Sequence, residues 1–273
     1  MKFLTVLIIV FLYRNWIGGH PVRGRIPVQD YFHWFKQKDI AVNLRYFLAV
    51  GLPVILAFAI SLKVGGWIFG LVWFAFALAV MLYAVDIYDE DEIFEDQAKW
   101  LNEPEANIDL ETMQRRQDDF LMVTNYEIFQ SVYPALFWFL ILGPGGALAY
   151  VLSKQYLDGL SDDDDEMDLV ERIVYFMEWP AARISGLLYA LLGHFGRSFE
   201  VWLSSLGDTN ESIGVVLGYM ASAAIDTPTT EESGTVEAFA RASESTNEQL
   251  HSLMDRTLFG WLGVATIIAI IGL

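Results

Sequence analysis

Four runs of apolar residues constrain this sequence more than any other feature. They extend from Leu44 to Leu62, from Trp67 to Val85, from Val132 to Leu152 and from Leu258 to Leu273. A helix needs about 20 mainly apolar residues to cross roughly 30 Å of hydrocarbon, and each run approaches that length. The composition agrees, because 54% hydrophobic residues and a mean hydropathy of +0.36 exceed what soluble domains usually show. We therefore expect a multi-pass integral membrane protein with about four transmembrane helices.

The fold class expected from the sequence is all-α, since no stretch alternates apolar and polar residues as a strand does. The first two apolar runs are separated only by residues 63–66 and should form an antiparallel helical hairpin. Asp109 is a suitable N-cap for a polar helix that leads into the third run. Further helices are expected over residues 209–225 and, ahead of the last run, over residues 236–255.

Charge and hydropathy divide the chain into six segments. We expect an N-terminal apolar segment with a basic linker (1–43), a transmembrane hairpin (44–85), an acidic cytoplasmic loop containing a helix (86–131), a span broken at Gly-Pro-Gly-Gly (132–152), an acidic loop with interfacial helices (153–257) and a C-terminal transmembrane helix (258–273).

The N-terminal segment from Phe3 to Tyr13 follows Lys2 like a secretion signal but lacks a cleavage site, so we expect it to stay attached. Its eleven residues would rise only about 16 Å, which suits a helix that is half-inserted or packed against the other helices. A short fifth span is the alternative. The linker that follows is rich in Arg and Lys and should be cytoplasmic by the positive-inside rule. Counting spans from there places residues 153–257 outside.

The third apolar run contains the sequence Gly143-Pro144-Gly145-Gly146 at its middle, which interrupts the helical hydrogen-bond ladder. The run can be an ordinary kinked span. Alternatively, the break makes two half-helices that form a re-entrant hairpin, and both flanking polar regions then face the same side. The membrane side of residues 153–257 depends on this choice.

The net charge of −18 comes mainly from two acidic runs, "DIYDEDEIFEDQ" from Asp86 and "SDDDDEMD" from Ser161. Such runs usually form solvated loops, and the alternative is an electronegative mouth that gathers Mg²⁺ or a cationic substrate. So acidic a surface makes nucleic acid an improbable partner. The chain has no cysteine, its four histidines show no metal-ligand spacing, and no phosphate loop occurs. We expect no cofactor and assign no catalytic residue.

The stretch from Glu178 to Asp208 is too apolar for a surface helix and too charged for a span. Pro180, preceded by Trp179, is expected in the first turn of a helix. Small residues at helical spacing, among them Gly186, should let a second helix approach closely. We therefore expect a half-buried or interfacial helix packed against the transmembrane bundle.

Several polar residues of this stretch are candidates for a ligand pocket. Arg183 either snorkels to lipid head groups or lines a pocket for an anionic or polar ligand, with Tyr189 close by. His194 is expected at a helix end, and Asp208 in a turn or helix cap.

The residues "PALFW…GP…ALAY" from Pro134, "EWPAARISGLLYALLGH" and "WLSSLGD" resemble the AmpE family. That family comprises inner-membrane proteins described as regulatory signalling modulators of β-lactamase induction. The resemblance implies a bacterial inner-membrane location, the lipid bilayer as partner, and a response to β-lactam antibiotics through a small molecule derived from the cell wall. It assigns structural roles to Pro134, the Gly-Pro-Gly-Gly break, Trp179, Pro180 and Gly186.

The sequence is also similar to the CobD/CbiB family of membrane synthases, which form an amide during cobalamin biosynthesis. "GHPVRG" at residues 19–24 and "PAARISGLL" carry this likeness. If a ligase site were retained, His20, Arg23 and Arg183 would be its pocket residues. However, the Asp-Gly pair that the synthases carry before the third span is absent here. Three hypotheses follow: a regulatory membrane protein without enzymatic activity, an amide-forming ligase, or a small transporter that uses the broken helix.

Overall fold

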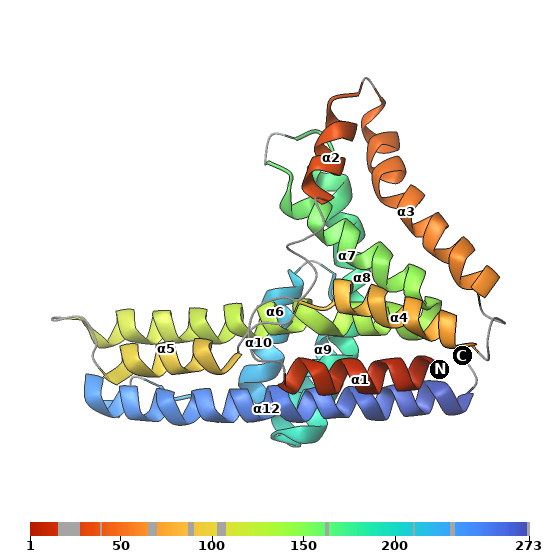
Figure 1. Ribbon diagram of the computed structural model, residues 1–273. Helices are drawn as coiled ribbons and strands as arrows, with labels where there is room; N and C mark the ends of the chain where they lie inside the picture. Colours follow the sequence, from red (N-terminus) through yellow and green to blue (C-terminus); the bar gives the residue numbers. More distant parts are fainter. Residues whose placement is uncertain are drawn as a thin grey trace. The chain divides into compact units, whose positions relative to one another are not determined.

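The computed structural model describes residues 1–15, 28–38, 40–64, 70–86, 90–102, 108–161, 164–209, 211–229 and 233–271. Within these ranges the regular secondary structure is helical (Figure 1), which confirms the expected fold class. The helices are α1 (Lys2–Asn15), α2 (Val28–Lys36), α3 (Val42–Val64), α4 (Leu71–Ala84), α5 (Glu90–Asn102), α6 (Leu110–Leu142), α7 (Pro144–Asp158), α8 (Met167–Leu192), α9 (Phe195–Ser205), α10 (Ile213–Ala224) and α12 (Val236–Ile271).

The chain forms two compact units. Unit 1 comprises Met1–Tyr88, Ser131–Ala181 and Leu262–Leu273, and unit 2 comprises Asp89–Gln130 and Ala182–Trp261. The three long helices α6, α8 and α12 contribute residues to both units.

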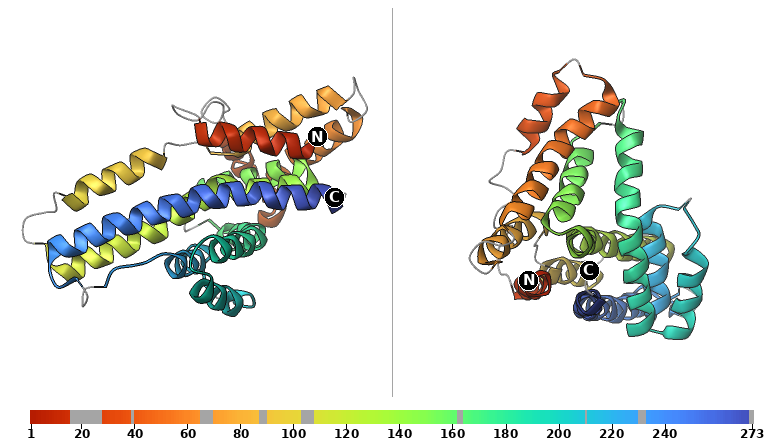
Figure 2. Two further views of the ribbon diagram at one scale, coloured as in Figure 1. Left: turned by 90° about the horizontal axis from the view of Figure 1, so that it is seen from below. Right: turned by 90° about the vertical axis from the view of Figure 1, so that its right-hand side faces the viewer.

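Unit 1 is organised around α7, which packs against both α3 and α4 (Figure 2), while α1 packs against α4. Close approach of α3 and α7 is possible because Gly145 lies under the ring of Phe58, where a Cβ atom would come within 2.7 Å of the ring. Buried hydroxyls of Tyr46 and Ser153 are hydrogen-bonded at 2.8 Å across the same pair of helices. Helix α7 is thus the interior helix of unit 1.

In the part of the chain that the structure describes, two helices are long and apolar enough to cross a membrane: α3 from Leu44 to Val64, and α12. Only 17% of the apolar window of α3 and 28% of that of α12 are buried. The core helix of a soluble protein would be mostly buried, so these exposed apolar surfaces favour a lipid environment. Helix α4 is shorter, with 14 residues. The count of four spans stays a prediction.

The third apolar run, predicted as one broken span, is divided between the end of α6 and the whole of α7. Gly143 joins them with φ 72° and ψ −158°, a backbone conformation that is essentially restricted to glycine. Pro144 then occupies the first turn of α7, where its missing N–H costs little. A Cβ atom on Gly146 would lie 2.4 Å from the carbonyl oxygen of Trp138, so the corner is also tightly packed. Pro134 lies inside α6.

The expectation that Pro180 lies in a first helical turn is wrong. Helix α8 begins at Met167, and Pro180 lies in its interior. The helix starts earlier because Val170 and Val174 supply buried apolar contacts one and two turns in. Proline in a helix interior removes one backbone donor; close to this point the Trp138 indole donates to the carbonyl oxygen of Met177 at 2.8 Å.

Other local expectations are confirmed. The carboxylate of Asp109 accepts a hydrogen bond from the backbone N–H of Thr112 at 2.7 Å, which caps α6. Helix α10 lies within the predicted range 209–225. The polar helix over 236–255 and the last apolar run are one continuous helix, α12.

Replacing Gly143 with alanine should lower the free energy of unfolding by about 1 to 3 kcal/mol, because the backbone conformation is unfavourable for any residue with a Cβ atom. No atom lies within 4 Å of the position that this Cβ would occupy, so the loss would be conformational rather than steric. Gly51→Ala in α3 is the matched control, since its Cβ also meets nothing within 4 Å and its backbone is helical. Thermal unfolding in detergent checks the pair; equal melting temperatures would contradict the assigned geometry.

Candidate functional site

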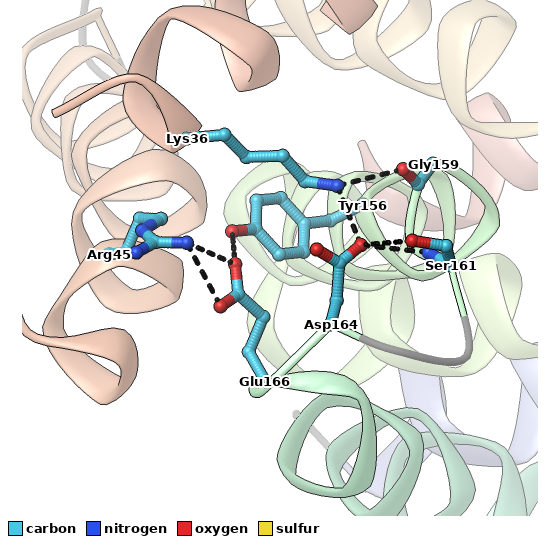
Figure 3. Close-up of polar contacts among 7 residues, drawn as sticks. All are labelled: Lys36, Arg45, Tyr156, Gly159, Ser161, Asp164 and Glu166. Carbon is cyan, nitrogen blue, oxygen red and sulfur yellow. Dashed lines mark hydrogen bonds and ion pairs between the residues drawn. The ribbon is translucent and has the colours of Figure 1, made fainter.

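Five side chains of unit 1 form a cluster of charges and hydrogen bonds, here called the charge cluster: Lys36, Arg45, Tyr156, Asp164 and Glu166 (Figure 3). Lys36 is the last residue of α2 and Arg45 lies in the first turns of α3. Tyr156 belongs to α7, and the two carboxylates lie in the connection to α8. The charge cluster therefore joins the basic linker of the sequence to its second acidic run.

The Arg45–Glu166 pair is the buried part of the charge cluster. The Nη1 atom of Arg45 lies 3.2 and 3.1 Å from the two carboxylate oxygens of Glu166. Tyr156 donates its hydroxyl proton to Glu166 Oε1 at 2.8 Å. The Glu166 side chain is 1% exposed and that of Arg45 is 19% exposed. A carboxylate so far from water is stable only when it is paired and hydrogen-bonded, and this arrangement meets both conditions.

The Lys36–Asp164 pair lies nearer the surface. Lys36 Nζ is 2.9 Å from Asp164 Oδ2 and 3.1 Å from the carbonyl oxygen of Gly159. Asp164 also accepts hydrogen bonds from the backbone N–H and the hydroxyl of Ser161, at 2.8 and 3.0 Å. The bond from the Ser161 backbone and the bond from Lys36 lower the pKa of the Asp164 carboxyl to about 2. Asp164 is therefore ionised throughout the physiological range.

Aromatic packing positions these groups. The ring of Tyr156 meets Phe32 of α2 edge to face at 5.0 Å between centroids, and Tyr46 of α3 at 5.5 Å. Gln29 of α2 also donates its side-chain amide to the carbonyl oxygen of Gln155 at 3.1 Å. Helices α2 and α3 thus hold the end of α7 between them, and the charged groups converge on it.

A cavity of about 230 Å³ opens beside the charge cluster. It is lined by polar groups of α2 and by the end of α7, namely Gln29, Asp30, Phe32, His33, Lys36, Tyr156 and Gly159. Cavities for drug-sized ligands measure roughly 300 to 1,000 Å³. The volume therefore suits a small polar group or one end of a longer molecule.

None of the ligand-pocket residues expected from the sequence lies in the charge cluster; they belong to unit 2 or fall outside the described residues. His20 and Arg23 are outside the described residues. Arg183 belongs to unit 2, is 5% exposed, and donates through Nη2 to the carbonyl oxygens of Ser205 and Asp208 at 2.8 and 2.9 Å. The structure thus brings Arg183 and Asp208 together through a main-chain contact at the end of α9.

The motif around Arg183 works as a clamp between helices. The indole N–H of Trp202 in α9 donates to the carbonyl oxygen of Arg183 at 2.8 Å. Arg183 in turn donates to carbonyl oxygens at the end of α9, so each helix donates a hydrogen bond to the other. Gly186 allows the close packing, because a Cβ atom there would lie 2.1 Å from the sulfur of Met220. The small-residue face expected in this stretch therefore serves helix packing within unit 2.

Tyr189 and His194 lie apart from this clamp. Tyr189 is fully buried and donates to Asn125 Oδ1 at 2.8 Å. His194 precedes α9, as expected of a helix-end histidine, and its Nε2 lies 3.3 Å from the exposed carboxylate of Asp226. Arg197 also contacts that carboxylate at 3.1 Å, and the hydrogen bonds from Arg197 and His194 lower the pKa of Asp226.

Sequence reasoning missed the charge cluster. The acidic run from Ser161 predicts a hydrated loop or an open acidic mouth, whereas Glu166 within it is buried and paired. The sequence does contain a signal for this pairing: the linker ahead of the first apolar run is basic, and the run that follows the third apolar run is acidic. Among the described residues, no group of His, Asp and Glu is placed to hold a metal ion.

The fold and the charge cluster define an all-helical protein with exposed apolar helices of membrane-spanning length and a polar site at the helix ends. Residues 86–245 match the family model described as "Regulatory signalling modulator protein AmpE". The chain belongs to the AmpE family, a family of membrane proteins, and this membership supports a role as a regulatory signalling modulator.

Two curated proteins are similar to parts of the chain. Protein AmpE of Shigella flexneri is 27% identical over 100 residues, which cover 34% of this chain and 35% of that protein. Cobalamin biosynthesis protein CobD of Chromobacterium violaceum is 35% identical over 77 residues, or 26% of this chain and 24% of that protein. The chain thus spans about a third or less of the length of the curated relatives it matches. No solved structure matches it.

Replacing either member of the Arg45–Glu166 pair should destabilise the protein by about 3 to 5 kcal/mol, because the remaining charge is buried without a partner. Arg45→Met and Glu166→Gln together should cost less than the sum of the two single changes. The exposed pair Arg115–Glu111, with side chains 70% and 86% exposed, is the control and should couple by roughly 0.5 kcal/mol or less. Unfolding in detergent checks both cycles, and additive effects at Arg45 and Glu166 would contradict the pairing.

The contribution of Asp164 should depend on pH. Its pKa is lowered from 3.8 to about 2 in the folded protein, so its stabilisation is complete above pH 3.8 and is lost as the pH falls through about 2. Asp164→Asn should therefore lower the melting temperature at pH 7 and make progressively less difference between pH 4 and pH 2. Asp158→Asn, which alters the neighbouring surface pair with Lys154, is the control. An Asp164→Asn effect that stays constant down to pH 2 would contradict the assignment.

Proposed function

We propose that the protein is a multi-pass regulator of the bacterial inner membrane that modulates β-lactamase induction in response to a small molecule derived from the cell wall. The match of residues 86–245 to the AmpE family carries this proposal. The Shigella relative bears the name of the same family. Transfer of the induction role to this chain is our inference from that membership.

Membrane embedding is supported by the surface of unit 1. Helix α3 exposes large apolar side chains along its length, including Ile55 at 66%, Leu56 at 61% and Leu62 at 84%. Its 23 residues rise about 34 Å, enough to cross the hydrocarbon layer. Lys36 and Lys38 ahead of α3, and Arg45 in its first turn, favour the cytoplasm at its N-terminal end. We propose the hairpin 44–85 and the segment 258–273 as membrane-inserted elements.

The charge cluster suits a conformational latch better than a reaction centre. Lys36, Arg45, Asp164 and Glu166 bind one another across three separate segments, and catalytic acids and bases must instead be available to a substrate. A ligand that carries a carboxylate would compete with Asp164 for Lys36 beside the cavity. Release of Asp164 would free the loop that begins α8, and α8 contributes to both units. Such an exchange is a physical means of coupling a bound molecule to a change elsewhere.

The size and lining of the cavity limit what could bind. At about 230 Å³ it would hold one sugar or the end of a short peptide, while the rest of the molecule stayed outside. His33, Gln29 and Lys36 offer donors, and Asp30 offers an acceptor. A muropeptide, which combines a sugar with a short peptide ending in a carboxylate, fits that chemistry.

A cobalamin-synthase-like ligase is the second candidate, favoured by the 35% identity to CobD over 77 residues. Its expected pocket residues are less favourable, since Arg183 is 5% exposed and is held by two backbone carbonyls. Rescue of a bacterial mutant that lacks the cobalamin synthase would promote this candidate over the regulatory one.

Deletion of the gene, in a host with inducible β-lactamase, should change the β-lactamase activity measured after exposure to a β-lactam by several-fold. The wild-type protein should restore induction. Glu166→Gln, which opens the latch, should restore it less well at equal membrane abundance. Glu111→Gln, at an exposed ion pair, should behave as wild type. Unchanged induction in the deletion strain would refute the proposed role.

A further inference from the structure

We infer that residues 131–158 form a re-entrant helical hairpin, so that the charge cluster and its cavity open to the cytoplasm. Anything that binds in this cavity would then come from the cytoplasm. The inference rests on the membrane embedding proposed above, and it concerns which side of the membrane the acidic loop occupies. Three sets of contacts within unit 1, together with the lengths of its helices, lead to it.

The break between α6 and α7 lies at the same end of unit 1 as the C-terminal half of α3 and the start of α4. Phe58, in the second half of α3, covers Gly145 at the start of α7. Trp73, at the start of α4, lies 6.5 Å from Phe139 near the end of α6, measured between ring centroids. The N-terminal end of α1 is also here, because Lys2 Nζ donates to the carbonyl oxygen of Leu140 at 2.8 Å.

The start of this hairpin lies at the opposite end of unit 1. The backbone N–H of Asp86, just past α4, donates to the carbonyl oxygen of Ser131 at 2.9 Å. If α3 and α4 cross the membrane as a hairpin, Asp86 returns to the side from which Arg45 started. Ser131 is on that side as well.

The last residues of the hairpin lie at the same end of unit 1 as Ser131. Tyr83, one residue before the end of α4, donates to Gln155 Oε1 at 2.7 Å. At the start of α3, Tyr46 bonds to Ser153 and Arg45 bonds to Glu166. Helix α7 is therefore antiparallel to α3, and the residues that follow it meet the basic linker directly.

The lengths of the two helical limbs are consistent with a re-entrant hairpin. The α6 limb from Ser131 to Leu142 rises about 18 Å and α7, with 15 residues, rises about 22 Å, so each limb is much shorter than α3, whose 23 residues rise about 34 Å. The corner from Gly143 to Gly146 is buried, which is the condition under which irregular backbone is tolerated at membrane depth.

The consequence reverses the orientation obtained by counting spans. Arg45 and Lys36 belong to the linker that the positive-inside rule places in the cytoplasm, and Glu166 and Asp164 touch them. Among the described residues, the helices between α7 and α12 include none with the length and hydropathy of a span. The loop after α7 and the helices that follow should therefore stay on the cytoplasmic side until α12.

Single cysteines test this, because the chain has none of its own. Asp158→Cys at the end of α7 and Glu211→Cys before α10 should be protected from a membrane-impermeant maleimide in intact spheroplasts and react in inverted vesicles. Lys38→Cys marks the cytoplasmic side and should behave identically. Lys63→Cys, at the other end of α3, should show the opposite pattern. Labelling after detergent solubilisation confirms that each thiol is reactive.

Two different failures are distinguishable. If Asp158→Cys labels together with Lys63→Cys from outside, α7 completes a crossing and the re-entrant hairpin is wrong, while membrane embedding stands. If an alkaline carbonate wash releases the protein from membranes and all four thiols react alike, the embedding itself is wrong. Glu211→Cys provides an independent position should Asp158→Cys fail to accumulate.

Discussion

Glu166 carries a carboxylate of which 1% is exposed, and such a group keeps its charge inside a protein only when a cation and hydrogen-bond donors meet it. Arg45 and Tyr156 supply both. The contact ties the start of α3 to the start of α8 across 121 positions of sequence. The end of α7, the Lys36–Asp164 pair and the cavity all lie beside this attachment, because Tyr156 of α7 bonds to Glu166 and lines the cavity together with Lys36. Breaking it would release the connection between α7 and α8.

The break between α6 and α7 and the charge cluster fix the two ends of α7. Gly143 lets the chain reverse after α6, so α7 can lie inside unit 1 while α3 presents apolar side chains outward. The family match covers residues 86–245 and so includes Asp164 and Glu166, whereas Lys36 and Arg45 precede it. The charge cluster thus connects the family-defining region to the N-terminal helices. Within unit 2, Arg183, the last residue of the Trp-Pro-x-x-Arg motif, forms a helix clamp with Trp202 of α9.

Much of the fold could be predicted from the sequence, because hydropathy and capping are local properties. The helical class, the N-cap Asp109 and the break at Gly143 all follow from nearby residues. Pro180 alone suggests the first turn of a helix, whereas burial of Val170 and Val174 extends α8 back to Met167. The charge cluster could not be predicted, since pairing between residues more than a hundred positions apart depends on the return of α7. The roles of Arg183 and Tyr189 could not be predicted either, because their partners lie on other segments, 22 and 64 positions away.

The most direct test of this account is zero-length cross-linking of the protein in native membranes with a water-soluble carbodiimide, followed by mass spectrometry of the peptides. With Lys36 Nζ 2.9 Å from Asp164 Oδ2, an amide should form between these two side chains and should be absent from the Lys36→Arg variant. The local pairs Lys154–Asp158 and Lys99–Asp96, at 2.6 and 2.7 Å, report that the reagent has reacted. Cross-links at both local pairs without one between Lys36 and Asp164 would contradict the charge cluster, on which the proposed topology and latch depend.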